Sequence, residues 1–284
     1  METITASRVR SILPRRDPAG HKGDFGKLLC VCGSVGYTGA PVFASRAAVR
    51  TGAGLVFLAV PEQAWPVVAV KSEEAMPFPL PETAEGRLSL LAEEPIRQRA
   101  ASCDAVLIGC GLGRDRQTDA LVRKLLDIDR PLVLDADGLN ALDGCPEQLQ
   151  RRTGPTVLTP HEGEFLRLGG DLSRGREAAA AAFSRKYGVY LVLKGHRTLV
   201  ADPEGRLAVN ETGNSGMAKG GSGDVLAGML GALLCQMPAR DAVQTAVWLH
   251  GRAGDLCAGR MGEYAMNPTD VIAALPEVTK PIIR

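Results

Sequence analysis

Short runs of hydrophobic residues alternate along the chain with longer segments that carry apolar residues at helical spacing. The short runs contain many β-branched residues, so they predict buried strands. Strands are expected at residues 27–32, 55–60, 105–108, 132–134, 156–158 and 189–193. Helices are expected between them, at residues 40–51, 117–126, 138–142, 161–168 and 173–187. Strands that alternate with helices are typical of a parallel sheet covered by helices on both faces.

The pattern changes after the sixth strand. "TLVADPEGRLAVN" (198–210) predicts a hairpin with its turn at 202–205, and therefore an antiparallel edge on the sheet. Helices at 224–235, 242–258 and 270–275 follow. The proline-rich "AMPFPLPETAEG" (75–86) is predicted to be a surface loop. The expected architecture is a single α/β domain over 1–284, with residues 1–20 as an N-terminal segment.

Composition excludes several classes of function. The chain has 284 residues, 45% hydrophobic and 23% charged, which is typical of a globular protein. A formal net charge of +1 without a long basic run argues against a nucleic-acid partner. The longest apolar stretch, 225–235, is too short to span a membrane, and the N-terminus has no apolar signal core, so a cytoplasmic location is predicted. The seven scattered cysteines favour reduced thiols over a disulfide framework or a zinc site.

In a doubly wound sheet, ligands bind beyond the carboxyl ends of the strands. Two loops there are rich in glycine, "GSVGYTGAP" (33–41) and "IGCGLGRD" (108–115). Neither matches the dinucleotide or the Walker pattern, and glycines also serve tight turns. "LDADGLNAL" (134–142) places Asp135 and Asp137 near a helix start, where capping is an equally good explanation for Asp137.

Two further loops carry candidate chemistry. In "LTPHEGEFLRL" (158–168), Thr159 fits an N-cap and Glu162 the third helical position, which leaves His161 as either a substrate contact or an exposed residue. In "LKGHRT" (193–198), Lys194 and Arg197 flank Gly195 and are able to hold phosphate, although an ordinary basic turn has the same composition.

The stretch "ETGNSGMAKGGSGDVLAGMLGALL" (211–234) gives the sharpest prediction. Its glycines precede an apolar helix, whose first amides and positive dipole end attract anions. Residues 220–223 (Gly220, Gly221, Ser222 and Gly223) are therefore predicted to form an anion hole. A carboxylate beside it, Asp224, is placed to take the proton from a hydroxyl that attacks phosphorus. Dipole stabilisation alone does not require the glycine-rich backbone in front of it.

Five motifs in this order resemble the ADP-dependent NAD(P)H-hydrate dehydratases of the ribokinase-like superfamily: "HKGDFGK" (21–27), "LDADGLNAL", "TPHEGEF" (159–165), "LKGHRT" and "GGSGDVLAG" (220–228). The resemblance extends from about residue 21 to residue 275. It implies a ribokinase-like fold and a repair reaction that returns the 6S hydrate of NADH or NADPH to the dinucleotide. The reaction would consume ADP, release AMP and phosphate, and proceed through phosphorylation of the C6 hydroxyl. A Mg²⁺ ion is expected on the ADP phosphates, with no ligand evident in the sequence.

The resemblance also implies roles for individual residues. The catalytic base is expected to be Asp224, which also contacts the substrate. Other substrate contacts are expected at Ala40, Gly111, Gly113 and His161. The adenine-nucleotide site is expected at Lys194, Gly195, His196, Arg197, Thr198 and Gly223.

Two departures from the family pattern and two alternatives remain at this stage. Lys219 stands where a small polar residue is expected, and "GNSG" (213–216) replaces GNPG. One alternative is an ATP-dependent kinase of a small alcohol, such as a thiazole or pyrimidine vitamin precursor, and the other is a nucleotide sensor without turnover. A homotetramer is expected by analogy, and an NAD(P)H-hydrate epimerase is expected as a functional partner because the chain has no room for that domain.

Overall fold

The computed structural model describes residues 1–13 and 15–283. In this part of the chain, ten strands form one sheet in the order β1-β10-β9-β8-β7-β6-β5-β2-β3-β4. The strands are β1 (Glu2–Thr3), β2 (Lys27–Val31), β3 (Leu55–Pro61), β4 (Met76–Leu80), β5 (Ala105–Ile108), β6 (Leu132–Leu134), β7 (Thr156–Leu158), β8 (Tyr190–Leu193), β9 (Leu199–Ala201) and β10 (Leu207–Val209).

The six predicted strands and the hairpin are confirmed. Neighbouring strands from β8 through β4 pair in parallel, whereas β9 pairs antiparallel with both β8 and β10. The turn between β9 and β10 is closed by a 2.8 Å hydrogen bond from the Gly205 amide to the Asp202 carbonyl. The sheet is therefore mostly parallel with an antiparallel edge, as predicted.

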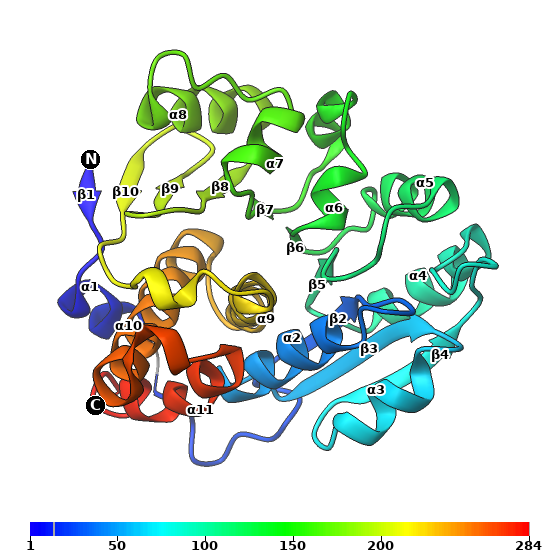
Figure 1. Cartoon of the computed structure of the whole chain (residues 1–284), viewed down its shortest axis with the longest axis horizontal. Helices are drawn as coiled ribbons and strands as arrows, with labels where there is room; N and C mark the ends of the chain where they lie inside the picture. Colours follow the sequence, from blue (N-terminus) through cyan, green and yellow to red (C-terminus); the bar gives the residue numbers. More distant parts are fainter. Residues whose placement is uncertain (14, 284) are drawn as a thin grey trace.

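Helices cover both faces of the sheet (Figure 1). Because side chains alternate along a strand, Leu28 and Cys30 of β2 enter one hydrophobic core, and Leu29 and Val31 enter the other. The first core includes residues of α1 (Ala6–Ile12), α2 (Gly39–Arg50), α3 (Trp65–Lys71), α9 (Ser222–Leu234), α10 (Ala239–Ala265) and α11 (Pro268–Thr279). The second includes residues of α4 (Glu93–Ala101), α5 (Arg116–Leu125), α6 (Asp137–Asn140), α7 (Glu162–Arg167) and α8 (Arg176–Tyr187). Short 3₁₀ turns occupy Leu90–Ala92, Pro146–Arg151 and Ser215–Met217.

The sequence prediction is wrong mainly at the proline-rich segment. The region 75–86 was expected to be a loop, but Met76–Leu80 forms strand β4 at the edge of the sheet. Pro77 and Pro79 are two positions apart, so the sides without an N–H face the same way. An edge strand needs hydrogen bonds on one side only, which is why proline is compatible with this position.

Helix α9 lies near the middle of the molecule, between α2 and α10 (Figure 1). It begins at Ser222, two residues before the predicted start. Close contact with α2 depends on Gly228, where a Cβ atom would lie 2.0 Å from the carbonyl oxygen of Ala44. This packing fixes the N-terminus of α9 against the sheet. In the described part of the chain, no helix has the length and apolar character that a bilayer span requires.

Candidate functional site

The carboxyl ends of β6 and β8 converge on the first turn of α9. Asp135 follows β6, Lys194 follows β8, and Asp224 lies in the first turn of the helix. A Cβ atom on Gly223 would lie 3.5 Å from Lys194 Nζ and 3.7 Å from Asp135 Oδ2, so the helix start is in van der Waals range of both side chains. The sequence predicted Lys194, Gly223 and Asp224 as site residues, and the structure brings them together.

Asp224 has the electrostatics of a general base that works near neutral pH. Burial, and next the nearby Asp135 carboxylate, raise its pKa from 3.8 to about 7, while Cys110 and Lys194 act in the opposite direction. A base is most effective when its pKa lies close to the working pH. The side chain is only partly buried, so a substrate hydroxyl has access to it.

Asp135 is the centre of a buried polar network that the sequence left unassigned. Its Oδ1 atom accepts hydrogen bonds from Thr159 Oγ1 at 2.7 Å and from Lys194 Nζ at 3.0 Å. Glu164 Oε2 lies 3.6 Å from the same ammonium group. Burial disfavours the charged form of Lys194, but the two carboxylates outweigh it and raise the pKa of Lys194. Lys194 therefore stays charged and is held at the edge of the anion hole.

The predicted anion hole is only partly free to bind a ligand. Gly221 is the N-cap of α9, with a φ of 101° that favours glycine. The Ser222 amide donates to the Lys219 carbonyl at 3.2 Å, so it is already engaged. The amides of Gly223 and Asp224 have no acceptor within residues 1–13 and 15–283. These two N–H groups are the ones available to an anion.

A cavity of about 620 Å³ opens beside the anion hole. All five residues of the predicted nucleotide turn line it, together with Gly223 and His161. The turn is held in shape because Arg197 pairs with Glu211 at 2.8 Å and Thr198 Oγ1 donates to the Gly195 carbonyl at 3.1 Å. The cavity therefore gathers the residues that the sequence predicted for the adenine nucleotide.

His161 lines the 620 Å³ cavity, whereas the other predicted substrate residues Ala40, Gly111 and Gly113 do not. It was expected beside the substrate residues, with Thr159 as the helix cap and Glu162 as its partner. Instead His161 is itself the N-cap of α7: its Nδ1 accepts from the Gly163 amide at 3.0 Å, and Glu164 completes a capping box. His161 therefore has a capping role that the sequence assigned to Thr159, and its contact with the substrate stays a prediction. The preceding Thr159 hydroxyl is committed to Asp135 and is unable to cap the helix.

The remaining predicted substrate residues lie on the other side of the site. A Cβ atom on Gly111 would lie 2.7 Å from Ala40 Cβ, so the two glycine loops are in contact. The Gly113 amide donates to Asp137 Oδ2 at 2.8 Å, which gives Asp137 a role in shaping this loop in place of a capping role. None of Ala40, Gly111 and Gly113 lines the 620 Å³ cavity. The structure thus provides two regions at the same edge of the sheet.

Two residues near the cavity have unexpected surroundings. Lys219 donates through Nζ to the carbonyls of Tyr264, at 2.7 Å, and Met266, so it caps the end of α10. His250, in the middle of α10, lines the cavity, and its buried Nε2 has no hydrogen-bond partner in the described residues. Burial lowers the pKa of His250 to about 4, so its imidazole is neutral at physiological pH. No local pattern in the sequence marks His250 for this position.

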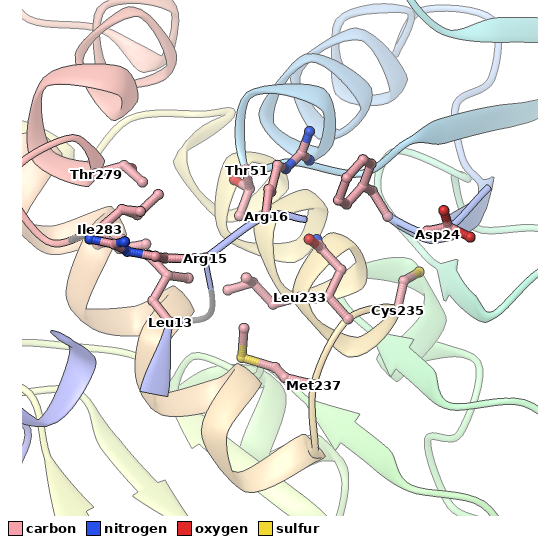
Figure 2. Close-up of a pocket in the computed structure, with 13 residues that line it drawn as sticks. Leu13, Arg15, Arg16, Asp24, Thr51, Leu233, Cys235, Met237, Thr279 and Ile283 are labelled. Carbon is pink, nitrogen blue, oxygen red and sulfur yellow. The ribbon is translucent and has the colours of Figure 1, made fainter. Parts of the chain in front are cut away.

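A second cavity of about 260 Å³ lies at the opposite end of α9 (Figure 2). It is bordered by Leu233 and Cys235 from that helix end and by Arg16, which stacks over the Phe25 ring at 4.1 Å. No residue that the sequence predicted for binding or catalysis lines it. The larger cavity is therefore the candidate site.

Comparison with known proteins agrees with this geometry. A family model described as NAD(P)H-hydrate dehydratase matches residues 28–277. The chain is 44% identical to a bifunctional NAD(P)H-hydrate repair enzyme of Moorella thermoacetica, over 98% of this chain and 53% of that protein. It is 34% identical to the ADP-dependent (S)-NAD(P)H-hydrate dehydratase of Bacillus subtilis, over 97% of both chains.

Solved structures give the same result. The crystal structure of the ADP/ATP-dependent NAD(P)H-hydrate dehydratase of Bacillus subtilis, co-crystallised with ATP and Mg²⁺, superposes with a TM-score of 0.83 at 31% identity. The match covers 99% of this chain and 98% of that chain. The chain spans about half the length of the bifunctional relatives that it matches.

Proposed function

The chain belongs to the NAD(P)H-hydrate dehydratase family, and from this premise we propose that it dehydrates the 6S hydrate of NADH or NADPH in an ADP-dependent reaction. The observation that carries the proposal is Asp224, a base with a pKa of about 7 next to two free amides and a nucleotide-sized cavity. That arrangement suits transfer of a phosphoryl group to a hydroxyl.

In the proposed first step, Asp224 takes the proton of the C6 hydroxyl as its oxygen attacks the β-phosphorus of ADP. The bond from phosphorus to the bridging oxygen breaks, and AMP leaves. The amides of Gly223 and Asp224 donate to the transferred phosphoryl group, where negative charge develops. Lys194 lies close to Gly223 and supplies a positive charge at the same place.

The second step is an elimination. Hydroxide is a poor leaving group, whereas phosphate leaves readily once the C6 oxygen is phosphorylated. The lone pair of the ring nitrogen assists cleavage of the C6–O bond, and loss of the proton at C5 restores the dihydronicotinamide. The balanced reaction converts the hydrate and ADP to NAD(P)H, AMP and phosphate.

We propose that ADP occupies the 620 Å³ cavity, with its phosphates toward Gly223. Mg²⁺ prefers oxygen ligands and is often held by one or two carboxylates together with phosphate oxygens. Asp135 Oδ2 fits this preference, because Lys194 and Thr159 contact Oδ1 and only the Cys110 thiol, a weak donor, lies near Oδ2, at 3.7 Å. The nearby Cys110 thiol does not fit, since contact with Cys32 and burial raise its pKa well above the usual range. Bound there, the ion would neutralise phosphate charge.

The decisive experiment mixes the protein with purified 6S NADH hydrate and either ADP or ATP, and follows the return of dihydronicotinamide absorbance. We expect turnover with ADP, and none with the Asp224→Asn variant. Absence of turnover with both nucleotides would contradict the proposal. A phosphorylated product that accumulates without elimination would favour the small-alcohol kinase, and full turnover by Asp224→Asn would remove the base from the mechanism.

Two expectations about the protein's context accompany this proposal. Dehydration of one C6 epimer alone leaves the other unrepaired, so an epimerase is the proposed functional partner. A homotetramer is proposed by analogy, and self-association is supported by the apolar side chains that α3 and β4 expose, namely Trp65, Val67, Val70 and Met76. Light scattering after gel filtration tests the tetramer, and fractionation of cells tests the cytoplasmic location.

A further inference from the structure

A small hairpin after β4 covers the first glycine loop. Glu82 and Leu88 form an antiparallel bridge, and the Thr83 amide donates to the Arg87 carbonyl at 2.7 Å. The hairpin is joined to the glycine loop by a 3.0 Å hydrogen bond from the Val35 amide to the Gly86 carbonyl. Its position is therefore fixed relative to the region that contains Ala40, Gly111 and Gly113.

Arg87 of this hairpin is an arginine without a partner. In the described residues, its Nε atom is buried and has no hydrogen-bond partner, and no ion pair is recorded for its guanidinium. By contrast, the Arg97 guanidinium pairs with Glu93 at 3.0 Å and with Asp127 at 2.6 Å. A partly buried cation without a counter-charge is costly, so its retention calls for an external anion.

The position of Arg87 shows which ligand is within reach. A Cβ atom on Gly113 would lie 2.4 Å from Arg87 Nε, so the guanidinium rests directly on the second glycine loop. This loop lies outside the lining of the 620 Å³ cavity, and Arg87 does not line it either. The hairpin also contains Thr83 Oγ1 and is followed by Ser89 Oγ, two more buried polar atoms without partners. Three buried polar atoms without partners thus lie in or next to this hairpin, and one of them, Arg87 Nε, lies against the Gly113 loop.

We propose that Arg87 binds a phosphate group of the dinucleotide substrate. The inference rests on the proposed function, because a dinucleotide hydrate whose C6 faces Asp224 must extend away from the ADP cavity. Arginine presents a planar set of donors that matches two phosphate oxygens, and this pairing is stronger than a neutral hydrogen bond. NADH hydrate offers its diphosphate only, and NADPH hydrate offers the diphosphate and a 2′-phosphate.

The test compares Arg87→Gln and Arg87→Lys with wild type on both purified hydrates. We expect Arg87→Gln to raise KM for the hydrate about 10- to 100-fold, with kcat and the KM for ADP unchanged. Arg87→Lys should recover part of the loss because it keeps the charge. If KM rises equally for both hydrates, Arg87 binds the diphosphate. If KM rises only for NADPH hydrate, Arg87 binds the 2′-phosphate.

Arg50→Gln is the matched control. Arg50 is exposed, makes no ion pair in the described residues, and lies at the far end of α2, about 18 Å along the helix from its start. Its kinetics should equal those of wild type, and circular dichroism should show that all variants fold. Direct calorimetric titration with NADPH, the product, should show the same weakening for Arg87→Gln without depending on turnover.

The outcomes separate the two proposals. If wild type is active and Arg87→Gln keeps its KM for both hydrates, the assignment of Arg87 is wrong while the proposed function stands. The assignment is also wrong if Arg50→Gln raises the KM for the hydrate as much as Arg87→Gln does, or if Arg87→Gln raises the KM for ADP instead. If wild type turns over neither hydrate, the proposed function fails, and the assignment of Arg87 fails with it.

Discussion

Replacing Asp224 with asparagine should stabilise the protein at high pH while abolishing turnover. The cause is the same burial that prepares the base for catalysis. The pKa of Asp224 rises from 3.8 to about 7 on folding, so the folded protein holds this proton more tightly than the unfolded chain does. Stability that is fully present below about pH 4 is therefore lost as the pH rises toward and through 7. Asparagine does not ionise and escapes this loss.

The size of the effect follows from the pKa change. Each pKa unit corresponds to about 1.4 kcal/mol. Relative to a group with an unshifted pKa, the raised pKa of Asp224 changes the free energy of unfolding by about 4 kcal/mol between full protonation and pH 8, and about 1.5 kcal/mol of that change is present at pH 5. The pH-dependent advantage of Asp224→Asn between these values is then about 2.5 kcal/mol. For a protein of this size the corresponding change in Tm is about 4 °C. Solvent access to the partly buried carboxylate makes this an upper estimate.

The assay is thermal unfolding of wild type and Asp224→Asn at several pH values from 5 to 8. The informative quantity is the difference in Tm between the two proteins, because a pH-independent effect of the amide cancels between conditions. Asp143→Asn, at an exposed position, controls for the loss of one surface charge. A difference in Tm that is constant across this range, or that shrinks as the pH rises, would refute the electrostatic account of Asp224.

Three more predictions test the same structure. The kcat/KM for the hydrate should rise about tenfold from pH 6 to pH 8 as Asp224 loses its proton, and a flat profile would exclude it as the base. Lys219→Met should lower the free energy of unfolding, measured in urea, by about 1 kcal/mol, because two carbonyls at the end of α10 lose their donor. The KM for ADP should stay within about twofold, and a large rise in that KM would instead assign Lys219 to phosphate binding. Gly228→Ala should destabilise by about 1–3 kcal/mol or more, since the new Cβ would clash with α2, whereas Gly259→Ala, on an open face of α10, should stabilise by up to about 1 kcal/mol.

The parts of the fold that the sequence predicts well have strong local signals. Buried parallel strands are continuous apolar runs, and the β9–β10 turn carries proline and glycine at turn positions. Strand β4 has no such signal, because its two prolines indicate a loop unless the edge position is known. The short helix α3 was also missed, since its exposed Val67 and Val70 obscure the amphipathic pattern. Tertiary context decides both elements.

The candidate site divides in the same way. Asp224 and the glycines before it were predictable because a helix start, glycine-rich backbone and a carboxylate are adjacent in sequence. Asp135 escaped because its partners, Thr159 and Lys194, come from two later strands and meet it only in the folded sheet. The assignment of Thr159 as the helix N-cap was wrong for a different reason: imidazole is an uncommon N-cap, so the more usual threonine was preferred over His161.

The charges around Asp224 explain why one lysine is not enough for the proposed reaction. Lys194 already faces the carboxylates of Asp135 and Glu164 at 3.0 and 3.6 Å. His250 adds no positive charge, because burial holds its pKa at about 4. Once Asp224 is ionised, this region carries more negative than positive side chains, and the phosphates of ADP would add to the excess. A divalent cation that enters with the nucleotide would restore the balance. Burial, followed by the Asp135 carboxylate, raises the pKa of Asp224 to about 7, so Asp224 is able to accept a proton near neutral pH.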